Sequence, residues 1–286
     1  MEEKNERGET LKEFLARYDE TQYRRPSNTV DMILLTVLKG KLKVLLVKRK
    51  DHPFIHDWAM PGGFVNFDED LDTAMKRELE EETNLFDSTY FRQLYTFGNA
   101  DRDPRTRVIT TVYLSMTPAE NIKMTSAGDD AMDTGWFTIQ KITTTTDGYE
   151  RKSILMLDDE EKGIHLRYEI YDTACDNYVQ TRSKLLDSSN AKLAADHIKA
   201  INMAIDVVRN RAASTGIMFN LLPKECTLRE IQEVYEAIVN HPVDTGNFRR
   251  DIKKMLVATG STTIVNGRKV ATYSFNPLLP FVKETL

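Results

Sequence analysis

The chain has 286 residues, enough for two modest domains, and its apolar content of 41% is sufficient to bury a core. Charged residues make up 29% and the formal net charge is −5, which argues against a broadly basic nucleic-acid coat. The two cysteines, Cys175 and Cys226, lie far apart, so we expect free thiols and neither a disulfide nor a zinc site. A charged N-terminus and the lack of an apolar run of about 18 residues predict a cytoplasmic protein with no signal peptide and no membrane span.

The chain opens with a short helix and a hairpin. Residues 9–19 place apolar side chains on one side of a helix, within an N-terminal extension that covers residues 1–28. Apolar, branched runs at residues 29–38 and 42–48 are separated by Gly40, and this pattern predicts a hairpin of two well-buried strands.

Candidate substrate contacts lie at and after the end of this hairpin. Arg49 ends the second strand and is either ordinary solvated charge or a contact for a phosphate group. The following loop reaches Gly62 and Gly63, whose lack of a side chain would let a ligand or a metal approach the backbone closely. Trp58 and Phe64 are expected to seat the loop by packing, and Phe64 is also a candidate substrate contact.

An acidic helix follows the glycine pair. Apolar residues recur three and four positions apart between Leu71 and Leu79, which predicts a helix. Glu78, Glu81 and Glu82 then share one face, within about one turn, where like charges raise each other's pKa. A divalent cation would relieve this repulsion, because Mg²⁺ and Mn²⁺ take hard oxygen ligands. The alternative is a solvated acidic face that holds no ion.

The spacing of the whole segment favours the ion. It resembles the Nudix box, the signature of hydrolases that act on a nucleoside diphosphate linked to another moiety. The matched positions are Gly63, Glu69, Arg77, Glu78, Leu79, Glu81, Glu82 and Leu85. The family's usual glycine before the last apolar residue is Asn84 here, a mild departure because Asn tolerates left-handed backbone angles.

The resemblance implies metal-assisted attack of water on phosphorus. It implies that Mg²⁺ or Mn²⁺ is held by Glu78, Glu81, Glu82 and the carbonyl of Gly63. One of these glutamates, or an acid from residues 129–133, would help to deprotonate the water. Asp130 is the candidate there, and the alternative is a polar turn before the next strand. Glu69 and Arg77 would support the geometry of the loop and the helix.

A charged loop lies between the next two predicted strands, residues 90–97 and 108–116. Arg105 and Arg107 in this loop are either part of a turn made rigid by Pro104 or a grip for phosphate oxygens. We favour the grip, because the stretch resembles that of ADP-ribose-handling Nudix proteins, especially those fused to a DNA-binding domain.

The Nudix-like domain is expected to span residues 29–186, with an inserted β-hairpin near residues 150–172, where apolar side chains alternate. Residues 190–212 predict the longest helix, which would link two domains or pack between two subunits. Asp196 and His197 in this helix are expected to be structural.

The last segment, residues 217–286, changes character. The sequence TLRE opens a helix over residues 227–240 with a capping-box pattern. A turn leads to a basic helix at residues 247–259, and Asn266-Gly267 predicts the turn of a hairpin. This order describes a winged helix-turn-helix. Its candidate DNA contacts are Arg249, Arg250, Lys253, Lys254, Arg268 and Lys269.

Charge supports DNA binding to a modest degree. Residues 224–286 carry nine Lys or Arg and seven Asp or Glu, a net charge of +2, while the rest of the chain carries −7. The alternative is a protein–protein module, since winged helices also serve that purpose. However, the stretch LLPKECTLREIQEVYEAIV followed by NFRRDI resembles the C-terminal domain of the Nudix-related transcriptional regulators, which implies a homodimer on two DNA half-sites.

These observations predict an α/β fold, a Nudix α/β/α sandwich with a mixed sheet, followed by a winged helix-turn-helix domain. The function that the resemblance implies is Mg²⁺-dependent hydrolysis of a nucleoside diphosphate derivative, with ADP-ribose giving AMP and ribose 5-phosphate, in a protein that also binds DNA. The alternative is a regulator that senses ADP-ribose without cleaving it.

Overall fold

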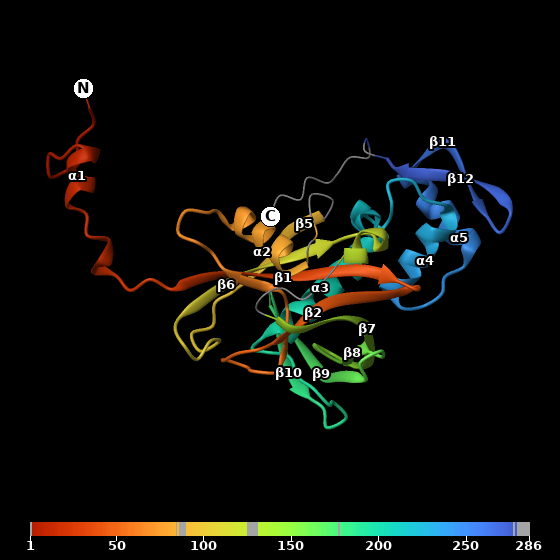
Figure 1. Cartoon of the computed structure of the whole chain (residues 1–286), viewed down its shortest axis with the longest axis horizontal. Helices are drawn as coiled ribbons and strands as arrows, with labels where there is room; N and C mark the ends of the chain where they lie inside the picture. The colour runs from red at the N-terminus through yellow and green to blue at the C-terminus, as the bar shows by residue number, and fades with distance from the viewer. Residues whose placement is uncertain are drawn as a thin grey trace.

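The computed structural model describes residues 2–83, 85, 90–124, 131–176, 178–276 and 278. Within these residues, one sheet of ten strands forms the centre of the molecule (Figure 1). Its strands are β1 (Ser27–Leu38), β2 (Lys41–Arg49), β3 (Trp58–Ala59), β4 (Gly62–Phe64), β5 (Tyr90–Phe97), β6 (Val108–Met116), β7 (Ala131–Asp147), β8 (Glu150–Asp159), β9 (Ile164–Cys175) and β10 (Tyr178–Leu185). Their order is β10-β9-β8-β7-β2-β1-β6-β5, with β3 beside β2 and β4 beside β1. The sheet is mixed, because β1 runs parallel to β6 and antiparallel to β2.

Two helices cover opposite faces of this sheet. The helices in chain order are α1 (Leu11–Arg17), α2 (Leu71–Thr83), α3 (His197–Ala212), α4 (Leu228–Val239) and α5 (Thr245–Ile252). Successive side chains of β1 point to opposite faces: Met32 is buried with Leu79 of α2, and Ile33 is buried with Ile205 of α3. The predicted α/β/α sandwich with a mixed sheet is confirmed.

The chain between β10 and α3 departs from the predicted helix over residues 190–212. The helix begins only at His197. The preceding residues run beside β3 instead: Trp58 donates its backbone N–H to Lys192 at 3.0 Å, and Ala194 donates to Trp58 at 2.8 Å. These backbone bonds to a strand replace the bonds that a longer helix would form, so the start of α3 is tied to the loop before the glycine pair.

The hairpin near residues 150–172 extends the sheet. β8 and β9 pair along their length beyond β7, and Leu155, Leu166 and Ile170 are buried in the same cluster as α3. Lys141 of β7 is buried as well, and its Nζ lies 2.6 Å from Asp206 of α3. The hairpin therefore widens the face of the sheet against which α3 packs.

The C-terminal segment forms the winged helix. The capping box predicted at Thr227 is present, with Thr227 accepting from the backbone of Glu230 and Glu230 accepting from that of Thr227. The second helix, α5, is shorter than the predicted residues 247–259: it ends at Ile252 and is followed by η4 (Lys253–Met255), because Leu256 already pairs with Phe275 of the wing.

The wing consists of β11 (Leu256–Val265) and β12 (Arg268–Phe275). Its turn is the predicted Asn266-Gly267 pair, whose φ angles of 50° and 75° are those that such a hairpin turn requires.

The N-terminal arm lies apart from the rest of the molecule. None of the seven residues of α1 is buried, and Figure 1 shows this helix projecting away from the sheet on the side opposite the winged helix. Cys175 and Cys226 are free, as predicted. Across the described residues, every helix is too short or too polar to span a membrane.

Candidate functional site

A cavity of about 920 Å³ opens between α2, the loop after β2 and the start of α3. Most of the predicted substrate and metal residues line it: Arg49, Gly62, Gly63, Phe64, Glu78, Glu81, Glu82 and Arg105. Arg107 does not line it, and its exposed side chain points elsewhere while its backbone oxygen accepts a hydrogen bond from Ser27. Asp130 and Asn84 lie outside the described residues.

Arg77 holds the acidic helix against the glycine strand. Its Nη2 donates to Glu69 Oε1 at 2.6 Å and to the Phe64 carbonyl at 3.0 Å. Its Nη1 donates to Glu78 Oε1 at 2.7 Å and to Glu81 Oε2 at 3.1 Å. The pKa of Arg77 is raised, chiefly by its hydrogen bond to Glu69. These contacts are those expected of a pair that supports the geometry of the loop and the helix.

The Glu78 carboxylate lies directly on Gly63. A Cβ added to Gly63 would stand 2.1 Å from Glu78 Oε1, so a side chain at this position would displace the Glu78 carboxylate. The Glu78 side chain is 10% exposed. Burial raises the pKa of Glu78, and the Arg77 guanidinium opposes that shift. The acid is thus pressed against the backbone that the sequence predicts as a metal ligand.

The donor set suits a hard divalent cation, because it consists of carboxylate and peptide oxygens. Among the described residues, however, no three Asp, Glu, His or Cys side chains converge on one point. Arg77 Nη1 lies between Glu78 and Glu81, and its positive charge offsets the negative charge of both carboxylates. The residues therefore fit Mg²⁺ or Mn²⁺ in chemistry, and Arg77 contacts one oxygen of each of these two carboxylates.

Basic side chains form the opposite wall of the cavity. Arg105 pairs with Asp103 at 2.9 Å, and its guanidinium carbon lies 5.5 Å from the centre of the Phe64 ring. The Arg102 side chain is only 7% exposed, and its Nη2 lies 2.9 Å from Asp196 Oδ1 and 3.8 Å from Asp31 Oδ2. This wall offers guanidinium groups that suit phosphate oxygens.

Arg102 was not among the residues predicted for the site, and Asp196 and His197 were predicted to be structural. Arg102 belongs to the same charged loop as Arg105, which is a signal that could have been used. The pairing of Arg102 with Asp196 joins residues far apart in the chain and leaves no local pattern. His197 lines the cavity as well, and its Nδ1 accepts the backbone N–H of Met60 at 2.9 Å. Burial lowers the pKa of His197.

The winged helix presents a basic outer face. The six predicted DNA contacts on α5, η4 and the tip of the wing are all exposed: Arg249, Arg250, Lys253, Lys254, Arg268 and Lys269. On the inner side, Phe248, Ile252 and Met255 are buried. The element that carries most of the basic residues is thus seated by its apolar side and leaves its cations accessible.

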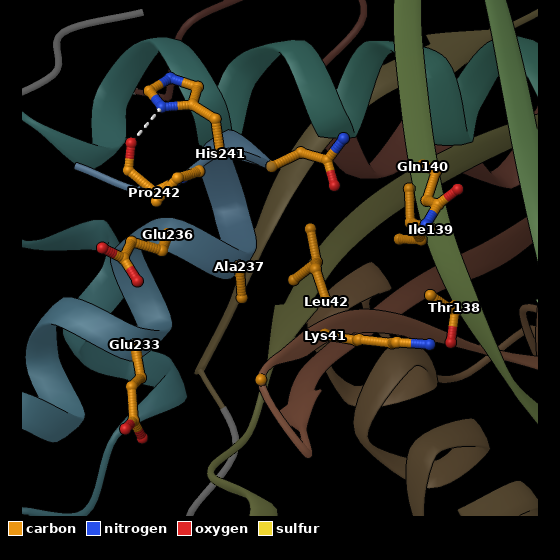
Figure 2. A pocket seen from close by; sticks show the side chains of 12 residues that line it. Lys41, Leu42, Thr138, Ile139, Gln140, Glu233, Glu236, Ala237, His241 and Pro242 are labelled. Atoms are coloured by element: carbon orange, nitrogen blue, oxygen red, sulfur yellow. Dashed lines mark hydrogen bonds between the residues drawn. The ribbon is translucent and has the colours of Figure 1, made fainter.

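A second cavity, of about 320 Å³, separates the winged helix from the sheet. Figure 2 shows Glu233, Glu236 and Ala237 of α4 on one side, and Lys41, Leu42 and Thr138 of the sheet on the other. The two domains are therefore incompletely packed along this part of their boundary.

Fold, acidic helix and basic winged helix together define a class of protein. Residues 26–157 match the NUDIX domain, and residues 218–275 match the NrtR DNA-binding winged helix domain. The chain belongs to the Nudix family, and within it to the members that carry an NrtR-type winged helix.

Three relatives show how far the similarity extends. The ADPR responsive transcriptional repressor NtrR of Acinetobacter baylyi is 28% identical over 92% of this chain and 87% of its own length. The ADP-ribose pyrophosphatase of Methanocaldococcus jannaschii is 33% identical over 49% of this chain and 80% of its own length. The structure of Shewanella oneidensis NrtR complexed with a 27mer DNA covers 87% of this chain and 93% of that one, with a TM-score of 0.61 and 26% identity.

Proposed function

We propose that this protein is a DNA-binding transcriptional regulator that responds to ADP-ribose. The observation that carries the proposal is the union, in one chain, of an arginine-walled Nudix cavity and an exposed basic winged helix. The similarity to the A. baylyi repressor supports it, because that similarity spans 92% of this chain and so includes both domains. Because such a regulator binds both DNA and a soluble nucleotide, we expect this protein to work in the cytoplasm.

The cavity suits a nucleotide sugar in size and charge. Its volume of about 920 Å³ lies within the range of small-molecule sites. Arg102 and Arg105 present planar forks that match the oxygens of a diphosphate. The ring of Phe64 is 46% exposed and offers a face on which a base can stack. We infer that the diphosphate of ADP-ribose contacts these arginines.

The basic face of the winged helix would contact DNA, and a homodimer would place two such faces on two half-sites. Light scattering is expected to give the mass of a dimer at micromolar concentration. A clean monomer at that concentration would count against this arrangement.

Hydrolysis of ADP-ribose is a second candidate function. The full set of box carboxylates favours it, together with the similarity to the M. jannaschii pyrophosphatase over 80% of that protein. Mg²⁺ or Mn²⁺, when bound by Glu78, Glu81, Glu82 and the Gly63 carbonyl, would lower the pKa of an attacking water and offset phosphate charge. One of these glutamates would accept the proton of the water, and Arg105 would steady the phosphates. The water then adds across the diphosphate bond to give AMP and ribose 5-phosphate.

Two measurements on the purified protein test these roles. Calorimetric titration with ADP-ribose should show saturable binding, and a protein that gives no heat and no turnover contradicts the proposed ligand. Chromatography after incubation with ADP-ribose and Mg²⁺ should show AMP, and Glu82→Gln should abolish its release if the box is catalytic. Binding without AMP release would mean that the site senses the ligand and does not cleave it.

A further inference from the structure

Helix α3 reaches from the ligand cavity to the winged helix. Ala195 and His197, at its start, line the cavity. Twelve residues beyond His197, about 18 Å at the rise of an α-helix, Arg209 contacts the end of α4. Between these points the helix is buried against both the sheet and α4 through a continuous set of apolar residues. A displacement at one end is therefore carried to the other.

The N-terminal end of α3 holds a carboxylate that has two possible partners. Asp196 occupies the cap position of the helix, where an Asp side chain usually accepts a hydrogen bond from the helix backbone, but no such bond is present. Its two oxygens instead accept hydrogen bonds from Arg102, at 2.9 Å and 3.3 Å. The carboxylate at the cap position is thus engaged with Arg102 and not with the helix backbone.

The residue before this cap is held in an unfavourable backbone conformation. Ala195 has a φ of 43°, in the left-handed region that non-glycine residues rarely adopt. Such strain persists only where the surroundings hold it in place, and here the turn is flanked by the backbone bonds of residues 192–194 to Trp58 and by the Arg102–Asp196 pair. Loss of that pair would allow the turn into α3 to relax.

The C-terminal end of α3 contacts the winged helix through apolar packing and through the side chain of Arg209. Arg209 Nε donates to the carbonyl of Ile238, at the end of α4, at 2.9 Å, and its Nη1 donates to the carbonyl of Lys141 in the sheet at 3.2 Å. The cation thus lies at the negative end of α4. The cavity in Figure 2 lies beside this contact, so that part of α4 is not fixed by continuous packing on the sheet.

We propose that α3 couples ligand binding to DNA binding by an exchange of partners at Asp196. The diphosphate of the ligand takes Arg102, Asp196 turns to cap α3, and the change at the helix start passes through Arg209 to the end of α4. The inference rests on the proposed function of the cavity as an ADP-ribose site. It adds the two residues that transmit the signal and contact neither ligand nor DNA: Asp196 and Arg209.

The test measures the coupling between the two sites, which is the ratio of DNA dissociation constants with and without saturating ADP-ribose. The probe is a duplex selected from a random-sequence library with the wild-type protein. Coupling factors in such systems are about 5- to 150-fold. Arg209→Met should reduce the ratio to less than about threefold while leaving ADP-ribose affinity unchanged by calorimetry.

Asp196→Asn provides the second arm. Asn caps a helix well but pairs weakly with arginine, so this variant should give, without ligand, the DNA affinity that the wild type reaches with ADP-ribose. Arg229→Met removes an exposed cation of α4 that pairs with Glu233 of the same helix, and serves as the matched control. It should keep the wild-type ratio.

The outcomes separate the two proposals. If wild-type protein binds neither ADP-ribose nor DNA, the proposed function fails and the coupling fails with it. If both bind and Arg209→Met keeps the wild-type ratio, only the coupling through α3 is overturned. Should Arg209→Met not fold, Arg209→Lys keeps the charge but cannot bridge both carbonyls, and it must also lower the ratio.

Discussion

Oε1 of Glu78 lies so close to Gly63 that a Cβ on that glycine would stand 2.1 Å from it. The acidic helix and the glycine strand therefore meet without space for any side chain at residue 63. This contact brings the carboxylate beside the peptide that the Nudix resemblance assigns to the metal. The Glu78 side chain therefore restricts what can stand at residue 63, a position within strand β4.

Gly63→Ala should displace the Glu78 carboxylate. We expect ADP-ribose-dependent AMP release, or ADP-ribose binding if the site only senses, to fall at least about tenfold, and the free energy of unfolding to fall by about 1–3 kcal/mol from overpacking. Calorimetry and urea unfolding measure the two effects. Gly98→Ala is the control, because its new Cβ would meet nothing closer than 3.9 Å. Equal losses in both variants would contradict the role of the close contact.

Buried His197 should make stability depend on pH in mildly acidic buffer. Burial lowers the pKa of His197 below its ordinary value of 6.5, so the unfolded chain binds a proton at a pH where the native protein does not. The free energy of unfolding is thus undiminished above pH 6.5 and falls as the pH drops below it, by up to about 1.4 kcal/mol per pH unit.

His197→Asn removes this titration while it keeps an acceptor for the backbone N–H of Met60. Melting temperatures measured from pH 7.5 to pH 5, about 2.5 units, should fall more steeply for the wild type than for the variant. Parallel curves would mean that His197 takes up its proton equally in the folded and unfolded states.

Lys141 should be costly to remove. Its side chain is 3% exposed, with Asp206 at 2.6 Å and Asp172 at 4.0 Å. Lys141→Met leaves buried acidic groups with less positive charge, and we expect a loss of about 3 kcal/mol in urea unfolding. Lys41→Met is the control, since the pair of Lys41 with Glu160 is exposed, and its loss should cost at most about 1 kcal/mol. Similar losses in the two variants would show that burial of Lys141 is unimportant.

The basic face of the winged helix should determine the salt dependence of DNA binding. A plot of log affinity against log salt has a negative slope. Arg249→Ala and Lys253→Ala should each reduce the magnitude of that slope by about one, because each cation releases about one counterion from the DNA. Arg229→Ala, on the exposed part of α4, should leave the slope unchanged. Equal changes from all three would assign the effect to net charge and not to this face.

The fold could largely be predicted from local pattern. The apolar, branched run of β1 and the spacing of the box from Gly63 to Leu85 each depend on neighbours in sequence, and the structure has the strand and the helix that they indicate. The predicted start of α3 at residue 190 was wrong for a physical reason. Residues 192–194 form backbone hydrogen bonds with Trp58, a long-range partner that overrides helix propensity.

The site could be predicted only in part. The carboxylates of α2 lie on one helix, so their spacing alone brings them together at the cavity. Arg102 pairs with Asp196, which lies almost a hundred residues later in the chain, and nothing in the sequence marks that pair. Arg107 belongs to the same charged loop, and its place there suggested a contact with phosphate oxygens. It is not among the residues that line the cavity.

The proposed function requires that one chain binds DNA and changes its affinity for DNA when ADP-ribose binds. The most direct test is fluorescence anisotropy of a labelled duplex, selected with the wild-type protein, at about 0.15 M salt with and without saturating ADP-ribose. We expect the dissociation constant to change by at least about fivefold with ADP-ribose, and to stay unchanged with the same concentration of AMP. Equal dissociation constants with and without ADP-ribose would contradict the account.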